Sequence, residues 1–403
     1  MPLEGHTEVG FRVGEAQATS GMQNRSLTHA RWNRLATYRH PTVRDVAFVL
    51  ACPQLVESSE TLRITEALPN QGKAEEEWEW LQGLDESPQL VENWMEEHGK
   101  HRKGDRRLGI YYSDLVEFVL QSCPSFDYGH ICTGVQVNGT KRRQDGAAVL
   151  TTIGEFDVLL ESQNGYESKH ALEHWEMTVK FLLHVDSYRE SGLPPIPLMC
   201  PLNTFLGPHK AENLLDRTAR LQRQLRLSKE PAAMRIIEEN FEASEMEIKT
   251  MAHIQGYLFY HVHFWAQHHR CLETSIAPDA TQLLKINPKH WHGWWLHADC
   301  VHVLGTLFPG SRWHVVPKLR WLSPVVMVSG DDEELLSLED LIDMLSQLAV
   351  ACRKTGKWRQ QRLLLAEMTL NPDLHDGVWI ESSRGFVVEQ GWPTDPLLLG
   401  PLE

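Results

Sequence analysis

The strongest constraint on the fold is a change in the spacing of apolar residues near residue 123. Before this point apolar side chains recur every three or four residues, which predicts an amphipathic helix ending near Cys123-Pro124. After it, apolar and polar residues alternate in three segments, and this period of two predicts three strands. The helical positions are Leu108, Tyr111, Tyr112, Leu115 and Val119, and the strand segments are about 131–137, 153–160 and 174–181.

Turn signals and two later segments complete the expected core. Asn138-Gly139 and Asp145-Gly146 are typical turn pairs after the first strand, and a loop with Asn164-Gly165 precedes the third. A second helix is expected over His209–Leu227, and Gly256–Tyr260 offers one more strand. The fold class is therefore α/β, or α+β, with a core in the order α-β-β-β-α-β over about residues 108–262.

The rest of the chain is expected to elaborate this core. Residues 1–28 have little apolar periodicity and predict a flexible tail, and residues 29–403 predict a single domain with a C-terminal extension at about 330–403. Residues 40–50 predict the first packed element, and the acidic run Glu75–Glu97 predicts surface helices. Ser337-Leu-Glu-Asp340 predicts a capping box that opens a helix to about Cys352, and Arg384–Val388 predicts the last strand.

Composition narrows the class of protein. With 403 residues, 42% of them hydrophobic, the chain has enough apolar surface for a sizeable core. No stretch approaches the roughly 18 apolar residues of a membrane-spanning helix, and the N-terminus lacks a secretory signal pattern. The seven cysteines are scattered without a CxxC pair, which favours reduced thiols. We expect an intracellular, cytoplasmic protein that does not contact membranes.

The net charge of −15 opposes broad electrostatic attraction to a nucleic-acid backbone. A nucleic-acid substrate would therefore need a local basic patch or a bridging divalent metal.

Ionisable residues in the middle of apolar strands are the strongest indication of chemistry. Glu155 and Asp157 lie on the second strand, and Glu176 and Lys180 share one face of the third. If these strands pair, carboxylates and an ammonium group meet. Two carboxylates suffice to hold Mg²⁺, and a nearby lysine can orient a metal-bound water, which is the chemistry of phosphodiester hydrolysis. The alternative is a structural ion pair between Glu176 and Lys180 at a sheet edge.

Several short segments together resemble the domain-of-unknown-function 1853 family, which is grouped with the PD-(D/E)XK nuclease-like superfamily. The resemblance covers nearly everything after about residue 38. It rests on Val43-Arg44-Asp45, Leu108-Gly109, Gly154-Glu155-Phe156-Asp157, His174-Trp175-Glu176 through Lys180, Gly207-Pro208, Gly256–Tyr260, Gly385-Phe-Val-Val388 and Gly391-Trp392-Pro393.

The resemblance implies a restriction-endonuclease-like core with helical elaborations. It implies that Asp157 and Glu176 bind Mg²⁺ or Mn²⁺, that Lys180 acts with them, and that DNA or RNA is the partner. The superfamily spacing is acid-x-Lys, whereas Glu176 and Lys180 are four residues apart, or about 13 Å along a strand at about 3.3 Å per residue. A bulge or a shifted lysine would accommodate this spacing. An acid on the first helix, Asp114 or Glu117, is a further candidate.

Three other clusters have both a functional and a structural interpretation. Histidines between 253 and 269 are compatible with a transition-metal site or with core and surface histidines. Trp291, Trp294 and Trp295 are compatible with base stacking or with a core. The series Arg217, Arg220, Arg223 and Arg226 is compatible with phosphate contacts or with a solvated helix face.

Two functional hypotheses follow. The first is a metal-dependent, nuclease-like hydrolase in which Asp157 and Glu176 bind the metal, Glu155 assists and Lys180 supports the attacking water. The second is a non-catalytic binding or scaffold protein that keeps the nuclease fold.

Overall fold

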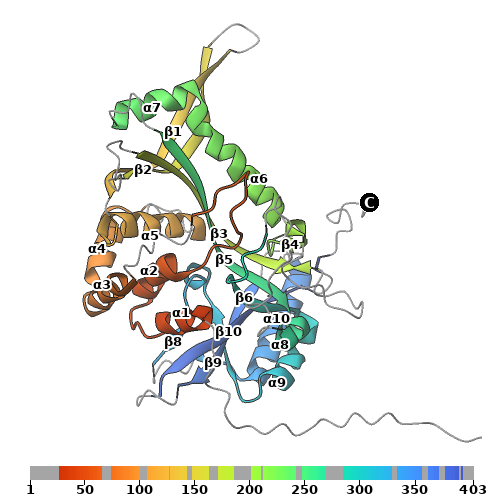
Figure 1. Ribbon diagram of the computed structural model, residues 1–403. Helices are drawn as coiled ribbons and strands as arrows, with labels where there is room; N and C mark the ends of the chain where they lie inside the picture. Colours follow the sequence, from red (N-terminus) through yellow and green to blue (C-terminus); the bar gives the residue numbers. More distant parts are fainter. Residues whose placement is uncertain are drawn as a thin grey trace, which may run out of the picture.

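A computed structural model gives the arrangement of the chain (Figure 1). It describes residues 27–65, 74–99, 107–126, 128–142, 148–162, 171–185, 201–209, 212–241, 247–268, 285–328, 334–355, 362–371, 377–389 and 392–393. Residues 1–26 of the predicted tail, the pairs Asp145-Gly146 and Asn164-Gly165, and Gly391 lie outside the described residues. No helix in the described ranges is both long and apolar enough to span a bilayer.

The described residues form ten α-helices and ten strands. The helices are α1 (Leu27–Leu35), α2 (Pro41–Ala51), α3 (Ala74–Glu86), α4 (Gln89–Glu97), α5 (Leu108–Ser122), α6 (Leu214–Gln224), α7 (Pro231–Phe241), α8 (Val262–His268), α9 (Leu304–Leu307) and α10 (Leu338–Thr355). The strands are β1 (Tyr128–Arg142), β2 (Ala148–Ser162), β3 (Ala171–His184), β4 (Phe205–Leu206), β5 (Ile248–His261), β6 (Trp291–His297), β7 (Arg312–Val316), β8 (Val326–Met327), β9 (Leu363–Leu370) and β10 (Trp379–Val388). A 3-10 helix, η5 (Leu225–Lys229), continues α6.

All ten strands belong to one sheet. Its main path is β1-β2-β3-β5-β6-β10-β9-β7, with β4 beside β3 and β8 beside β10. The outer strands pair antiparallel, whereas β3, β5, β6 and β10 in the middle run parallel. The mixed α/β class is therefore confirmed.

Helices cover the two faces of the sheet (Figure 1). In the main hydrophobic core, the helices from α1 through α5 pack on one face of the sheet. The side chains of this core include Phe48, Tyr112, Trp175 and Tyr257. Three smaller cores lie under α6, α7 and α10 and the segments around them. Trp291, Trp294 and Trp295 are at most 3% exposed, so their structural interpretation as core residues is confirmed.

Local sequence signals explain several boundaries. The backbone N–H of Asp340 donates to the Ser337 hydroxyl, and the backbone N–H of Ser337 donates to the Asp340 carboxylate, which is the capping box predicted to open α10. α6 is shorter than the predicted helix because Asn213 caps it, accepting a hydrogen bond from the backbone N–H of Asp216 at 2.8 Å. The turn predicted at Asn138-Gly139 is wrong. This pair lies inside β1, where the register with β2 shifts and marks a bulge.

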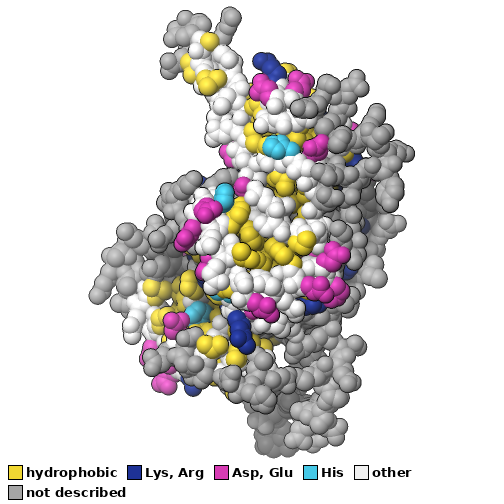
Figure 2. Space-filling view, turned by 90° about the vertical axis from the view of Figure 1, so that its left-hand side faces the viewer, with side chains coloured by type: hydrophobic (Ala, Val, Ile, Leu, Met, Phe, Trp, Pro, Cys, Tyr) yellow, Lys and Arg dark blue, Asp and Glu magenta, His cyan; other side chains and the backbone are white. Residues whose placement is uncertain are grey.

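The far halves of β1 and β2 form a two-stranded arm that projects from the body of the protein (Figures 1 and 2). Its outer part carries three exposed apolar side chains, of which Leu150 is 72% exposed, Ile153 46% and Val149 40%. The arm leads along β2 directly to Glu155 and Asp157, so it lies at one end of the candidate site described next.

Candidate functional site

The candidate site lies where β2 and β3 separate. Their antiparallel pairing runs from Ser162 opposite Ala171 as far as Val158 opposite Trp175. Asp157 and Glu176 are the next residues, so they stand at the point where the two strands part. Beyond it β3 remains paired with β5 on its other side.

Beyond this point, two side chains form hydrogen bonds with the backbone of β3 along the edge where β2 no longer pairs with it. Oδ2 of Asp157 accepts a hydrogen bond from the backbone N–H of Met177 at 2.8 Å. The backbone carbonyl of Met177 accepts one from the guanidinium of Arg217 at 3.5 Å. Asp157 and Arg217 thus take the place of the missing strand.

The backbone of β2 changes its orientation at Asp157. Val158 packs in the main core, as strand alternation from Leu160 requires, but Phe156 packs in the small core below α7. The register places Gly134 of β1 opposite this point, with a φ of 62° in the left-handed region. A local twist therefore aims the Asp157 side chain toward β3.

The carboxyl groups of Asp157 and Glu176 contact each other. Burial first and the neighbouring Glu176 second raise the pKa of Asp157, the Met177 N–H and Arg217 lower it, and the net result is a pKa of about 7. Burial also raises the pKa of Glu176 to about 7, against hydrogen bonding to Asp157 and the charge of Arg217. Since carboxylates have no donor of their own, this contact needs a shared proton or a cation.

Glu176 is completely buried, and its two oxygens differ. Oε1 lies 3.0 Å from Nε2 of His174. Burial lowers the pKa of His174 to about 4, so the ring is neutral at pH 7. In the tautomer with its proton on Nε2, the ring donates to Oε1. Among the described residues, Oε2 has no partner at hydrogen-bonding geometry. The backbone N–H of Asp157 lies close enough to this carboxyl group to lower its pKa. A buried carboxylate oxygen without a well-placed donor is costly, which indicates a site made to receive a proton or a cation.

Arg217 places a positive charge beside the pair on the α6 side. Arg217 is half-buried in the first turn of α6, and its charge acts on both carboxyl groups. Nζ of Lys180 lies 2.5 Å from Oε2 of Glu212, which precedes α6. Burial lowers the pKa of Lys180, with the hydrogen bond to Glu212 acting against it. Lys180 therefore faces Glu212, and the charge of Arg217 lowers the pKa of both carboxyl groups.

The structure brings Asp157 and Glu176 together but separates the other two predicted residues from them. Glu155 is exposed and lies opposite Gln136 of β1, and its charge is the smallest of the effects on the pKa of Glu176. No register shift with β5 occurs between Glu176 and Lys180, so the four-residue spacing stays extended.

The backbone of β5 fits closely against Lys180. Gly256 pairs with Lys180 and has a φ of 128°, a conformation that favours glycine. A Cβ at this position would lie 1.8 Å from the Lys180 carbonyl oxygen. Gly256 therefore sets how near β5 approaches β3 beside the site.

Other predicted candidates lie elsewhere. Asp114 is 1% exposed within α5, and Glu117 accepts a hydrogen bond from Thr133 at 2.6 Å. His253 is buried and bonded to Thr65, whereas His263 is exposed. In the part of the chain that the structure describes, no group of three or more His, Cys, Asp or Glu residues is arranged to hold a metal ion. A metal at the carboxyl pair would thus have two protein ligands.

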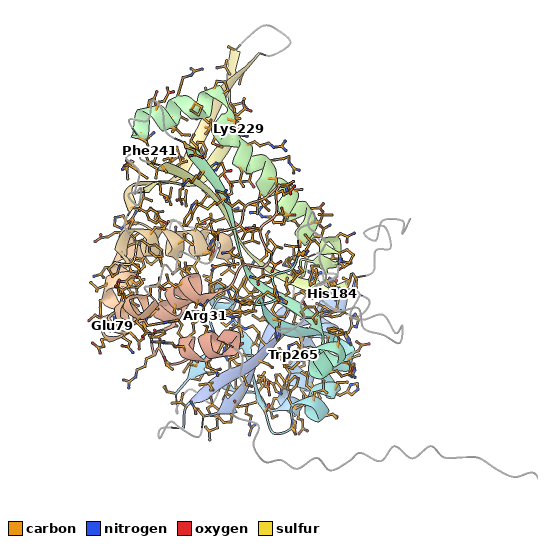
Figure 3. The ribbon with its side chains drawn as sticks, viewed as in Figure 1. Arg31, Glu79, His184, Lys229, Phe241 and Trp265 are labelled. Atoms are coloured by element: carbon orange, nitrogen blue, oxygen red, sulfur yellow. The ribbon has the colours of Figure 1, made fainter. Side chains whose placement is uncertain are left out.

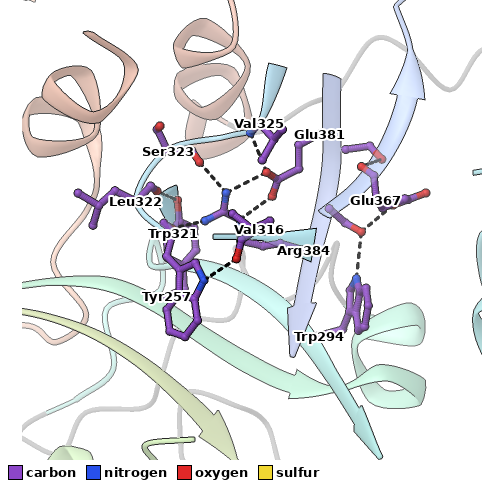
Figure 4. A network of polar contacts seen from close by, with 12 residues as sticks. Tyr257, Trp294, Val316, Trp321, Leu322, Ser323, Val325, Glu367, Glu381 and Arg384 are labelled. Carbon is purple, nitrogen blue, oxygen red and sulfur yellow. Dashed lines mark hydrogen bonds and ion pairs between the residues drawn. The ribbon is translucent and has the colours of Figure 1, made fainter. Parts of the chain in front are cut away.

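A second buried group of charges lies far along the chain, at β10 (Figure 4). Arg384 is 1% exposed and donates to both oxygens of Glu381 and to the carbonyls of Trp321 and Ser323. Its guanidinium also lies 4.7 Å from the Tyr257 ring centroid. These four bonds engage all three guanidinium nitrogens and both carboxylate oxygens, so this network holds β10 against the loop before β8.

Fold and site together define a mixed α/β protein with a buried carboxyl pair at the fork between two strands. The chain belongs to the family described as domain of unknown function (DUF1853), whose model matches residues 44–388. No curated protein and no solved structure is similar enough to be matched with the chain.

Proposed function

We propose that this protein is a divalent-metal-dependent hydrolase of phosphodiester bonds in nucleic acid, with Asp157 and Glu176 as ligands to Mg²⁺ or Mn²⁺. The supporting observation is the buried contact between these carboxyl groups, each with a pKa of about 7, together with the buried Oε2 of Glu176, which has no partner at hydrogen-bonding geometry among the described residues. Strongly shifted pKa values of this kind cluster at functional sites.

The residues present fit such a cation. Mg²⁺ and Mn²⁺ favour hard oxygen ligands, and Mg²⁺ is commonly held by one or two carboxylates with water and substrate phosphate oxygens filling the remaining positions. A divalent cation would neutralise the two carboxylates in place of the shared proton. When bound, it would supply a polarised phosphoryl oxygen and a more acidic water.

The other residues of the site would position these ligands and the substrate. His174 fixes Oε1 of Glu176, and the Met177 N–H fixes Oδ2 of Asp157. Arg217 stands beside the pair, where its guanidinium would bind a phosphate oxygen. Lys180 would need to leave Glu212 to act on an attacking water. Glu155, on the exposed side of β2, would act only through its charge.

The order of elements supports a restriction-endonuclease-like core. α5, β1, β2, β3, α6 and β5 occur in this order along the chain, with the short β4 inserted before α6 and with α7 inserted before β5. β1, β2 and β3 pair antiparallel, and β5 is parallel to β3. The carboxyl pair falls on the second and third strands of this series. Fold analogy alone does not establish activity, so the site must be tested directly.

A cleavage assay tests the proposal. The wild type should cut labelled DNA or RNA with Mn²⁺ or Mg²⁺ and not with EDTA. Asp157→Asn should lose about 100-fold or more of this rate, because loss of a direct ligand should cost at least as much as loss of a residue that only orients one, which is about 10–100-fold. Asp216→Asn removes one exposed carboxylate from the nearby helix and should keep the rate. Glu155→Gln reports whether Glu155 takes part. Equal activity in Asp157→Asn and the wild type would refute the assigned site.

The ion pair between Lys180 and Glu212 favours a second candidate, a nuclease-fold protein that binds nucleic acid without cutting it. Its lysine is already neutralised and stands four residues from Glu176. This candidate predicts nucleic-acid binding without cleavage under any divalent metal, whereas the first predicts metal-dependent cleavage.

A further inference from the structure

A line of cations leads away from the carboxyl pair along α6 and η5. It consists of Arg217, Arg220, Arg223, Arg226 and Lys229, which recur at every third residue, and we call it the cation line. Arg217 touches the backbone of β3 beside the site. The four others are exposed, and in the described part of the chain none of them has an ion-pair partner.

The cation line lies along β3 and β2, the two strands that contain the carboxyl pair. Leu227 of η5 lies against Gly154 of β2, where an added Cβ would come 2.9 Å from its side chain. Gly154 is three residues from Asp157, on the side of the projecting arm. Figure 1 shows α6 running diagonally from β4 toward α7 and the arm, and Figure 3 shows Lys229 at the upper end of this path.

We propose that the cation line binds the sugar-phosphate backbone of one nucleic-acid strand and guides it to the carboxyl pair. This inference rests on the proposed function and adds the binding surface that such a substrate would need. In a chain with a net charge of −15, unpaired exposed cations in one row are the local basic patch that nucleic acid requires.

The length of the line suits a run of phosphates. The line is about 20 Å long, with about 10 Å along α6 at about 1.5 Å per residue and about 10 Å along η5 at about 2.0 Å per residue. One strand of duplex DNA carries a phosphate about every 3.4 Å along the axis, so the line spans about six phosphates. The apolar side of α6 and η5, with Leu214, Leu221 and Leu225, is buried in a core with β5, so the four cations after Arg217 face outward.

Fluorescence anisotropy in EDTA tests binding independently of the metal site. The probes are a labelled duplex of about 20 base pairs, the matching single strand, and anionic phospholipid vesicles; both nucleic acids are long enough for about five contacts. The wild type should bind DNA, and the triple variant Arg220→Ala, Arg223→Ala and Arg226→Ala should bind at least about tenfold more weakly at low salt. On the duplex, the slope of log K against log salt should fall by about 2.7, or about 0.9 for each lost contact.

Two matched variants make the result specific. Arg39, Lys289 and Arg312 are exposed cations away from α6, and replacing all three by Ala removes the same charge, so DNA binding should change less than about twofold. Lysine at positions 220, 223 and 226 should restore binding, because phosphate contacts need charge rather than one side-chain shape. Circular dichroism checks that each variant is folded.

Three outcomes would overturn the cation line: a wild type that binds neither DNA probe, equal weakening in both triple alanine variants, or arginine-dependent binding to vesicles without binding to DNA. Asp157→Asn should bind the probes in EDTA as well as the wild type or better, since it removes a negative charge. Loss of cleavage with retained, arginine-dependent binding would separate a failed metal site from a failed cation line.

Discussion

At the scale of single residues, the neighbouring polar groups compensate part of the energetic cost of burying the Asp157 and Glu176 carboxyl groups. His174, the Met177 N–H and Arg217 each interact with the pair, yet Oε2 of Glu176 has no partner at hydrogen-bonding geometry among the described residues. The remaining desolvation raises both pKa values, so the pair holds extra protons in the folded protein. This proton excess makes stability depend on pH.

The first prediction concerns the free energy of unfolding between pH 4 and pH 8. Asp157 and Glu176 have pKa values of about 7 when folded and ordinary values of 3.8 and 4.5. Because the pKa values are higher in the folded protein, proton binding by these two groups stabilises the fold. This contribution to the free energy of unfolding is fully present below about pH 4 and is lost as the pH rises through 7. Asp157→Asn should therefore gain stability relative to the wild type as the pH rises. Urea denaturation in metal-free buffers measures the difference; a pH-independent difference would contradict the shifted pKa values.

Arg384 gives a second prediction at this scale. Replacing it by Met leaves Glu381, which is 2% exposed, without its cation, and should cost about 3–5 kcal/mol of unfolding free energy. With Glu381→Gln in the background, the same replacement should cost clearly less, because no charge is left unpaired. Equal costs in both backgrounds would show that the two side chains do not act as a pair.

The sequence alone identified Asp157 and Glu176, because charges in the middle of apolar strands stand out from their neighbours. The sequence did not assign Arg217 to the site, because arginines recur at every third position of this helix and their spacing does not distinguish one from another. Only the tertiary packing of α6 selects Arg217 by placing it beside Met177. The separation of Lys180 from the pair depends likewise on Glu212, which lies 32 residues away along the chain.

At the scale of elements, the parallel pairing of β3 with β5 depends on Gly256. Gly256→Ala should destabilise the protein by at least about 2 kcal/mol, because the added Cβ meets the Lys180 carbonyl and the φ of 128° is strained for alanine. Gly83→Ala in α3 is the matched control. Nothing lies within 4 Å of its Cβ, so it should stabilise the protein by about 0.5–1 kcal/mol.

Thermal unfolding of the two alanine variants measures both effects. A Gly256→Ala protein as stable as the wild type would show that β5 does not approach β3 as closely as the structure indicates.

Helices and strands with a strong local period were predictable, and their ends less so. The apolar spacing located α5, and Ser337 with Asp340 located the start of α10. Asn138-Gly139 failed as a turn signal because β1 and β2 continue beyond it and pair with each other, which outweighs local turn preference. The same two residues mark a bulge instead.

At the scale of the whole molecule, the sheet joins distant parts of the chain. β10 lies inside the sheet between β6 and β9. β9 precedes it directly in the sequence, whereas β6 lies about 90 residues earlier. No local pattern in the sequence predicts which strand β10 will join, because parallel partners are chosen by long-range packing. The C-terminal segment predicted as an extension therefore contributes β10 to the middle of the sheet, with β9 beside it.

A truncation tests this arrangement. A chain ending at residue 371 keeps β9 but lacks β10, so β6 and β9 each expose an unpaired edge, and the buried Phe386 and Val388 are lost from the main core. The truncated protein should be insoluble or unfolded by circular dichroism, in contrast to the full chain. A soluble truncated protein with a cooperative unfolding transition would contradict a single sheet.

The central claim is that Asp157 and Glu176 form a cation site, and calorimetric titration of the full chain with Mn²⁺ tests it most directly. In two buffers of different ionisation enthalpy near pH 6.5, the wild type should bind one Mn²⁺ and release protons, because the cation replaces the proton that the pair shares. Asp157→Asn should lose both the binding and the proton release, and Asp216→Asn should keep them. Mn²⁺ binding that is absent in the wild type, or unchanged in Asp157→Asn, would contradict the account.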